Sequence, residues 1–463
     1  MITLFQDQSD QIDRVAESMR KGNKRVLMQA ATGAGKTIMS TEILRRAINK
    51  GSRTWFIVPR KSLLKQTSET YKSFGIPHSF VASGYQYDPN IGNHICSMQT
   101  LPRRLGGLRA PDIAIIDETH YGGAHLDKII TWLTAAGCWI VGLSATPKKH
   151  NGDGLDKWYD DLVLGVPMAE LINSGRLSAY KVFAPSTPDL SAVKITAGDY
   201  NKKQLNEWMH DHGDVLIGDA VKTYKDKAMG KIGLTFCTSI EESMRVAKAY
   251  NDAGVPACHL DGTVSKESRE FVINKLADGE IFQITSVDLM TFGFDLAAQV
   301  GRDVVIECMS DLAPTKSEAK QLQKWGRVLR RKDEPALIFD HSGNVFEHGM
   351  PNEEREWKLE GRKKRVRAVS EERDVEMRKC TKCYFCHPPK PVCPNCGNVY
   401  PVQPRTIKKI EGELEEVEAV KRKEKRMEVG QARTYEDLAR IARDRGYNPY
   451  WAKLMAQKKG IRV

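Results

Sequence analysis

The stretch AATGAGKT, residues Ala30–Thr37, has the composition of a loop that binds phosphate groups. It follows the short apolar run Val26–Met28 and opens a helical pattern over Ile38–Ile48. Its glycines allow backbone N–H groups to close around phosphate oxygens, Lys36 can reach the terminal phosphates of a nucleotide, and the Thr37 hydroxyl can bind Mg²⁺. The nucleotide contacts predicted from this loop are Thr32, Gly33, Ala34, Gly35, Lys36 and Thr37.

An acidic pair, Asp117 and Glu118, directly follows the apolar run Ile113–Ile116. A strand that ends there would deliver Asp117 to the magnesium ion and Glu118 to the attacking water. A solvated turn is the alternative, but four apolar residues immediately before the pair favour a buried strand. The loop and the acidic pair together predict hydrolysis of a nucleoside triphosphate.

Four cysteines near the C-terminus form two Cys-x-x-Cys pairs, Cys380 with Cys383 and Cys393 with Cys396, separated by nine residues. Four thiolates at this spacing suit tetrahedral Zn²⁺ in a structural site. Cys386 is a spare, and a ligand set in which it replaces Cys380 is an open alternative.

The elements that would position these residues alternate between strand and helix patterns, which predicts an α/β fold with parallel sheets covered on both faces. We expect a first lobe over residues 1–165, a connector over 166–214 and a second lobe over 215–350. The strands expected in the two lobes are Val26–Met28, Thr54–Val58, His94–Ser97, Ile113–Ile116, Trp139–Leu143, Ile232–Phe236, Ala257–Leu260, Phe282–Thr285, Val304–Cys308 and Ala336–Phe339.

Composition changes after the second lobe. We expect a basic linker over 351–378, the zinc ribbon over 379–402, a charged helix over 403–430 and a helical module over 431–463. The aromatic and basic residues of the last module could stack on single-stranded bases, or its aromatics could form the core of a helical pair. The aromatics concerned are Tyr447, Tyr450 and Trp451.

The net charge of +12 and the pI of about 9.1 favour a polyanionic partner, most simply nucleic acid. The N-terminus lacks the pattern of a signal peptide, and no apolar run approaches the roughly 20 residues that span a bilayer. These features predict a cytoplasmic protein without a membrane partner. The five cysteines outside the cluster are scattered, as expected for small core residues under reducing conditions.

Short motifs occur in the order typical of superfamily 2 helicases, and the chain resembles the DNA-directed DEAD/DEAH-like members of phages and of the RadD type. The resemblance covers roughly residues 4–331 and implies two RecA-like lobes. The stretches that carry it are Leu4–Gln8, Ala30–Thr37, Ile57–Arg60 with Leu63 and Gln66, Ser97–Leu101, Asp117–His120, Ser144–Thr146, Phe236–Ser239, Ser286–Asp295 and Gln323–Arg330.

The resemblance also implies roles for single residues. Gln8 would contact the adenine base, Gly293 and Asp295 would lie near the nucleotide, and Arg327 and Arg330 would neutralise the transferred phosphoryl group from one face of a helix. Three residues depart from the family pattern, namely Ala30, Thr119 and Trp325. His120 is either a core residue or a link between motifs, and we expect Trp325 to be an ordinary core residue.

These features predict an ATP-dependent DNA helicase or translocase that uses ATP, Mg²⁺ and Zn²⁺. Its partners would be single-stranded or branched DNA and a single-strand-binding or recombination protein, in repair, recombination or phage replication. An RNA helicase, a non-hydrolysing nucleic-acid-binding protein and the motor subunit of a restriction complex are the alternatives.

Overall fold

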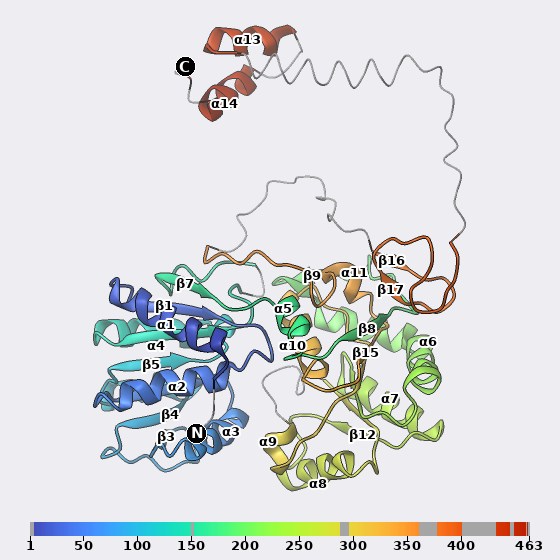
Figure 1. The fold of residues 1–463 in the computed structure, drawn as a ribbon, viewed down its shortest axis with the longest axis horizontal. Helices are drawn as coiled ribbons and strands as arrows, with labels where there is room; N and C mark the ends of the chain where they lie inside the picture. Colours follow the sequence, from blue (N-terminus) through green and yellow to red (C-terminus); the bar gives the residue numbers. More distant parts are fainter. Residues whose placement is uncertain are drawn as a thin grey trace. The chain divides into compact units, whose positions relative to one another are not determined.

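The structure is a computed structural model that describes residues 4–149, 152–287, 296–360, 377–400, 432–444, 449–459 and 461. The chain divides into two compact units, Met1–Val399 and Tyr400–Val463. The first unit contains two large parallel sheets, one in each lobe (Figure 1).

The sheet of lobe 1 has seven strands in the order β3-β4-β2-β5-β6-β1-β7, all paired in parallel. Its strands are β1 (Arg25–Gln29), β2 (Thr54–Val58), β3 (Ser79–Val81), β4 (Asn93–Ser97), β5 (Ile113–Ile116), β6 (Trp139–Ser144) and β7 (Asp161–Leu164). Its helices are α1 (Gln6–Arg20), α2 (Lys36–Ile48), α3 (Ser62–Ser73), α4 (Ala124–Ala135) and the 3₁₀ turns η1 (Leu101–Arg103), η2 (Leu105–Gly107) and η3 (Thr119–Tyr121).

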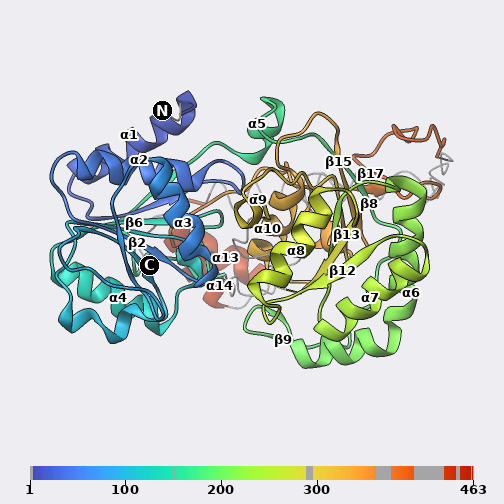
Figure 2. The same cartoon turned by 90° about the horizontal axis from the view of Figure 1, so that it is seen from below.

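Helices cover both faces of this sheet, with α1, α2 and α3 on one face and α4 on the other (Figure 2). Successive side chains of a strand point to opposite faces, so Val26 and Met28 join the core beneath α1–α3 whereas Leu27 joins the core beneath α4. A strand buried on both faces must be apolar throughout, and this explains the continuous apolar runs in the sequence.

The sheet of lobe 2 has six parallel strands in the order β12-β13-β11-β14-β15-β8. They are β8 (Tyr180–Phe183), β11 (Gly233–Phe236), β12 (Ala257–Leu260), β13 (Gln283–Ser286), β14 (Cys308–Asp311) and β15 (Ala336–Asp340). The helices, with one small hairpin, are α5 (Met168–Asn173), α6 (Lys202–Ala228), α7 (Ile240–Asp252), α8 (Lys266–Ala277), α9 (Leu296–Val300), α10 (Glu318–Val328), α11 (Asn344–His348) and the hairpin β9 (Ile195–Thr196) with β10 (Asp199–Tyr200).

The expected boundaries between lobes need correction. Strand β8 lies within the expected connector 166–214 but is the edge strand of the lobe 2 sheet, and α6 runs through position 215 without a break. Strand β14 begins at Cys308, where the strand expected over Val304–Cys308 ends. Val304 and Ile306 before it are buried without joining the ladder, and Val305 is exposed. The end of β14 was not recognised as a strand because its buried residues Ser310 and Asp311 are polar. Of the strands in the two large sheets, β3, β7 and β8 were not predicted.

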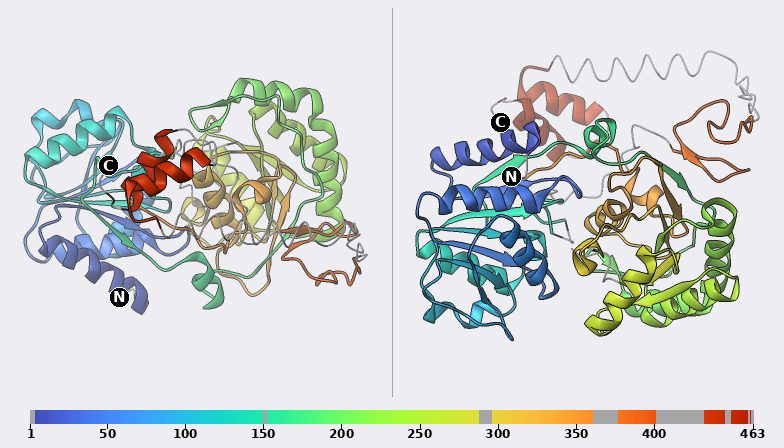
Figure 3. Two further views of the ribbon diagram at one scale, coloured as in Figure 1. Left: turned by 90° about the horizontal axis from the view of Figure 1, so that it is seen from above. Right: turned by 60° about the horizontal axis from the view of Figure 1, so that its bottom comes forward.

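The cysteine-rich segment is part of the first unit and packs on lobe 2, as Figures 1 and 3 show in orange. Its strands β16 (Arg378–Lys379) and β17 (Cys386–His387) pair antiparallel. The backbone N–H of Ala184 donates to the carbonyl of Tyr384 at 3.0 Å, and the rings of Phe183 and Phe385 lie 5.5 Å apart. The segment therefore covers the open edge of β8.

The second unit contains the expected helical pair, α13 (Tyr435–Asp444) and α14 (Pro449–Lys459). Its core is mainly aliphatic, built from Leu438, Ile441 and small alanines of both helices. Tyr447, the charged helix expected over 403–430, the basic residues 361–376 and most of motif V, with Gly293 and Asp295, lie outside the described residues. Within the described ranges, no helix is long and apolar enough to cross a membrane.

Candidate nucleotide and zinc sites

The phosphate loop has the expected form at the carboxyl end of β1. Gly33 and Gly35 have φ values of 86° and 89°, a left-handed conformation that glycine adopts without steric cost. Lys36 begins α2, so the loop and the helix N-terminus together present N–H groups to an anion. The Lys36 ammonium donates to the carbonyl of Ala30 at 3.2 Å, which holds the lysine over its own loop.

Gln8 lies against this loop, in the first turn of α1. Its amide nitrogen donates to the carbonyl of Ala34 at 2.8 Å, and its amide oxygen accepts from the backbone N–H of Phe5 at 3.0 Å. The contact with the adenine base stays a prediction. Sequence reasoning missed Arg176, whose guanidinium lies 4.2 Å from the centre of the Phe5 ring and pairs with Asp7.

The acidic pair lies at the carboxyl end of β5, as predicted. Loss of water around Asp117 and repulsion from Glu118 raise the pKa of Asp117 to about 7, although Lys36 opposes the rise. Glu118 has φ 45° and ψ 47°, a strained conformation for a residue with a side chain, and such strain is often found at active sites. Two crowded carboxylates beside a helix that begins Lys36-Thr37 are a donor set that fits Mg²⁺.

His120 connects the acidic pair to motif III. Its Nδ1 lies 2.9 Å from the Ser144 hydroxyl and 3.4 Å from a carboxylate oxygen of Glu118. The Ser144 hydroxyl donates to the carbonyl of Thr146 at 2.6 Å, so it accepts from an Nδ1–H of His120. His120 is only 1% exposed, so it is a core residue. It also contacts both motif II and motif III, so the two interpretations of His120 hold together.

Motif VI contacts lobe 1 through α10. A Cβ atom on Gly326 would lie 2.1 Å from the Thr32 methyl carbon, so the helix backbone packs directly on the phosphate loop. The Tyr121 hydroxyl, next to motif II, donates to the side-chain oxygen of Gln323 at 2.9 Å. The sequence offers one indication of this contact, a tyrosine directly after Asp-Glu-Thr-His. That residue alone does not identify its partner, because Gln323 lies in the other lobe.

The expected placement of both arginines on one helical face is wrong. Arg327 lies in the last turn of α10, which ends at Val328, and Arg330 lies beyond the helix in a backbone bridge with Leu177. Leu177 in turn contacts Gly33, since a Cβ there would meet its side chain at 2.7 Å. The Trp325 ring is 1% exposed, so it is the core residue that was predicted.

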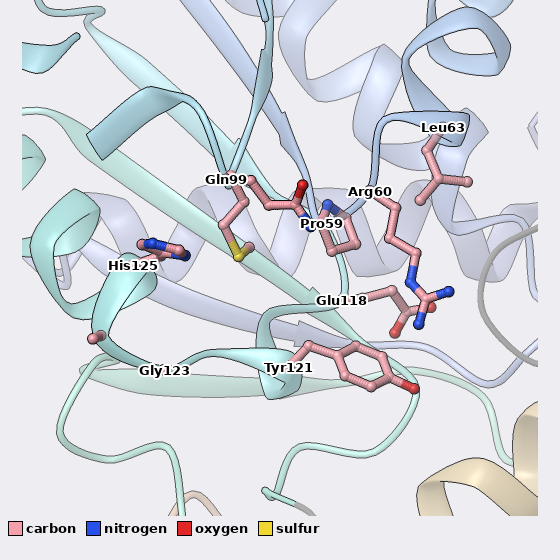
Figure 4. A pocket seen from close by; sticks show the side chains of 10 residues that line it. Pro59, Arg60, Leu63, Gln99, Glu118, Tyr121, Gly123 and His125 are labelled. Carbon is pink, nitrogen blue, oxygen red and sulfur yellow. The ribbon is translucent and has the colours of Figure 1, made fainter. Parts of the chain in front are cut away.

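A pocket of about 420 Å³ opens beside the acidic pair, at the carboxyl ends of β2, β4 and β5. Figure 4 shows the side chains of Arg60 and Glu118 directed toward one another, with the Tyr121 ring next to them. The pocket therefore joins motif Ia to the catalytic candidate of motif II. Its polar lining is Arg60, Gln99, Glu118, Tyr121 and His125.

The four predicted zinc ligands come together. All four sulfur atoms lie within 4.8 Å of one another, and the pairs Cys380–Cys396 and Cys383–Cys393 are each 3.7 Å apart. Zinc–sulfur bonds of about 2.3 Å in a tetrahedron place sulfurs about 3.8 Å apart, so the cluster fits Zn²⁺. Cys386 is excluded as a ligand because it is buried in the core of lobe 2, where burial raises the pKa of its thiol to about 12.

Two RecA-like lobes with a phosphate loop, an acidic pair and a helix of lobe 2 packed on that loop define the class of nucleotide-driven two-lobed proteins. Residues 1–149 match the family described as type III restriction enzyme, res subunit, and residues 216–332 match the helicase conserved C-terminal domain. A 51.5 kDa protein of a Lactococcus phage is 31% identical over 72% of this chain and 69% of its own length. The chain belongs to the superfamily 2 helicases of the DEAD/DEAH-like type.

Other relatives are longer than the matched region. IRC3 of Saccharomyces cerevisiae, a proposed ATP-dependent helicase, is 25% identical over 70% of this chain, which spans only 49% of it. The endonuclease subunit of the type I restriction enzyme EcoAI of Escherichia coli is 28% identical over 61% of this chain and 40% of its own.

Solved structures agree on the fold. A fragment of a proposed HsdR subunit from Vibrio vulnificus matches 74% of this chain and 65% of its own with a TM-score of 0.55 at 18% identity. The type ISP restriction-modification enzyme LlaBIII bound to DNA matches 73% of this chain and 27% of its own with a TM-score of 0.53 at 16% identity.

Proposed function

We propose that the protein hydrolyses ATP to move along or remodel DNA. The observation that carries this proposal is the direct packing of α10 on the phosphate loop, Gly326 against Thr32. A nucleotide in the loop would lie at the boundary between lobes, so a change in its terminal phosphate would alter how the lobes meet.

Each residue of the site has a role in this proposal. Lys36 binds the terminal phosphates, and Thr37 with Asp117 holds the Mg²⁺ that shields their charge. Glu118 orients the attacking water, while Arg327 and Arg330 neutralise charge that develops on the transferred group. Gln8, Gly293 and Asp295 contribute nucleotide contacts, and a Zn²⁺ held by Cys380, Cys383, Cys393 and Cys396 keeps the ribbon folded.

The nucleic acid would bind across the pocket beside motif II. Arg60 offers a charged contact for phosphate, and Gln99 a hydrogen-bonding one. Because Glu118 lines the same pocket, a strand there can influence how that carboxylate is oriented. This arrangement gives a physical route by which nucleic acid would stimulate hydrolysis.

DNA is favoured over RNA by the relatives rather than by the site. LlaBIII was solved bound to DNA, and the DNA 3'-5' translocase XPB2 of Sulfurisphaera tokodaii is 22% identical over 73% of this chain and 82% of its own. A structure of S. cerevisiae Dbp5 bound to RNA also matches, with a TM-score of 0.50 at 12% identity, so RNA is the second candidate. A single-strand-binding or recombination protein is the proposed protein partner.

The test is ATP hydrolysis measured with matched DNA and RNA oligonucleotides, single-stranded and forked. We expect DNA to stimulate hydrolysis more than RNA, and Lys36→Ala or Glu118→Gln to abolish it. Lys50→Ala, which removes an exposed lysine just beyond α2, is the matched control and should keep full activity. Full activity of the Lys36→Ala variant would refute the mechanism, and stronger stimulation by RNA would replace DNA as the substrate.

A further inference from the structure

The chain crosses back from lobe 2 to lobe 1 after α11, in a segment outside both matched helicase families. At the lobe 1 end, the carbonyl of Leu359 accepts from the backbone N–H groups of Leu155 at 2.7 Å and Asp156 at 3.2 Å. The Leu359 side chain packs on the core beneath α4. A Cβ on Gly154 would lie 2.2 Å from the Glu360 backbone, so the segment is seated directly on lobe 1.

The other end of the segment is fixed to lobe 2 by Arg355. Its Nε donates to a carboxylate oxygen of Glu318 at 2.8 Å. Its terminal nitrogens donate to four carbonyls at 2.8–3.3 Å, those of His348, Met350, Pro351 and Glu353. A guanidinium that is 11% exposed and makes this many hydrogen bonds rigidifies the start of the segment.

Glu318 joins this anchor to lobe 1. It is the first residue of α10, the helix that carries Arg327, and its carboxylate also pairs with Lys148, two residues after Thr146 of motif III. The Lys148 ammonium lies 5.3 Å from the centre of the Trp357 ring within the segment. The segment thus contacts both partners of an ion pair that spans the lobes.

The segment is held to lobe 2 on both sides. It leaves lobe 2 at α11, and the next described residues, 377–399, form the ribbon that packs on β8 of lobe 2. Its lobe 1 end, at Leu359, is hydrogen-bonded to lobe 1. Because Leu359 closely follows Arg355, which is fixed to lobe 2, separation of the lobes requires loss of either the Leu359 contacts or the Arg355 anchor.

We propose that residues 351–360 are a clasp that holds the two lobes together before ATP binds. The clasp would keep α10 near the phosphate loop, so more molecules would already be competent to bind nucleotide. Apparent affinity falls in proportion to the competent fraction, so loss of the clasp would raise KM for ATP. The clasp is a property of the fold, but its effect on KM rests on the proposed ATP hydrolysis.

Gly154→Ala tests the clasp selectively. Gly154 does not have a positive φ, so alanine is compatible with its backbone conformation. The three atoms nearest to the new methyl group all belong to the backbone of Leu359 and Glu360. The matched control is Gly262→Ala, at a glycine that also lacks a positive φ and where a Cβ meets no atom within 4 Å. Leu359→Asp is a second variant, which weakens the clasp without altering lobe 1.

Three measurements on the full chain decide the matter. Hydrogen exchange measures the protection of the Leu155 and Asp156 amides. Cross-linking by a short bis-maleimide measures the proximity of the lobes in a background that carries Lys65→Cys and Glu270→Cys. Steady-state kinetics of ATP hydrolysis gives KM and kcat separately. Lys65 and Glu270 form an ion pair across the lobes at 3.7 Å. In both clasp variants we expect faster exchange, slower cross-linking without ATP and a several-fold higher KM, with kcat within about twofold of wild type.

Fast exchange in both variants with unchanged cross-linking and KM would overturn the clasp, and so would protected amides in both variants. Absence of ATP hydrolysis in the wild-type protein would instead refute the proposed function. Exchange and cross-linking would still test the clasp in that case, since neither needs activity.

Discussion

Gly326→Ala should separate the stability of lobe 2 from the closure of the two lobes. Alanine in a helix interior is favoured over glycine by about 0.5–1 kcal/mol, so α10 itself should be stabilised. Across the cleft, however, the new Cβ would lie 2.1 Å from the Thr32 methyl carbon and 2.5 Å from its Cβ. Overpacking of this kind costs about 1–3 kcal/mol, and here the cost falls on the closed arrangement.

The expected result is a midpoint of thermal unfolding equal to or above that of wild type, with KM for ATP raised about 5- to 150-fold. We also expect kcat to fall, because Arg327 follows Gly326 directly and moves with it. Thr32→Ser removes the closest atom and should partly restore KM in the double variant. Gly218→Ala in α6, where a Cβ meets no atom within 4 Å, is the control.

Two results would refute this reasoning. Wild-type kinetics in Gly326→Ala would mean that the contact with Thr32 does not form during turnover. A lower unfolding midpoint would mean that the collision strains lobe 2 itself rather than the boundary between lobes.

Three further predictions follow from the sites. Cys393→Ser should lower zinc content, measured by atomic absorption, while Cys386→Ser should keep one zinc per chain; equal loss in both would contradict the ligand set. Tyr121→Phe removes the hydrogen bond to Gln323 and should reduce stimulation of ATP hydrolysis by DNA more than the basal rate, and an unchanged ratio would count against coupling through this bond. Burial favours the neutral form of Glu318, but its two cationic partners outweigh this and lower its pKa to about 2 from 4.5. The ion pair should therefore be fully formed above about pH 4.5 and weaken as pH falls toward 2, so the free energy of unfolding, measured with denaturant, should fall over that range more steeply in wild type than in Glu318→Gln.

The sequence predicted the parts of the site that depend on local order along the chain. The phosphate loop, the acidic pair and the cysteine pairs each lie within a few residues of a strand end or a turn, and their spacing alone fixes which atoms can converge. The strands β2, β5 and β12 were predicted to the residue because their limits are marked locally. Strand β5 is an apolar run between Asp112 and Asp117, β2 ends before Pro59, and β12 begins after Pro256.

Contacts between distant residues were not predictable in this way. Tyr121 and Gln323 are separated by 202 positions, and nothing in either neighbourhood indicates the other. Arg330 was misplaced because the sequence pattern continues past Val328, whereas the bridge to Leu177 ends the helix there. Strand β8 was missed because it joins a sheet whose other strands all follow it in the chain by at least 50 residues.

The position of the ribbon against β8 sets a limit on how the protein can be shortened. An edge strand with unpaired N–H and C=O groups is a template for intermolecular pairing and aggregation. A truncation after α11 would retain every helicase motif but would uncover Phe183 and the backbone beside it. The smallest well-behaved fragment should therefore extend to Val399, and metal depletion should promote self-association before it affects the chemistry of the cleft.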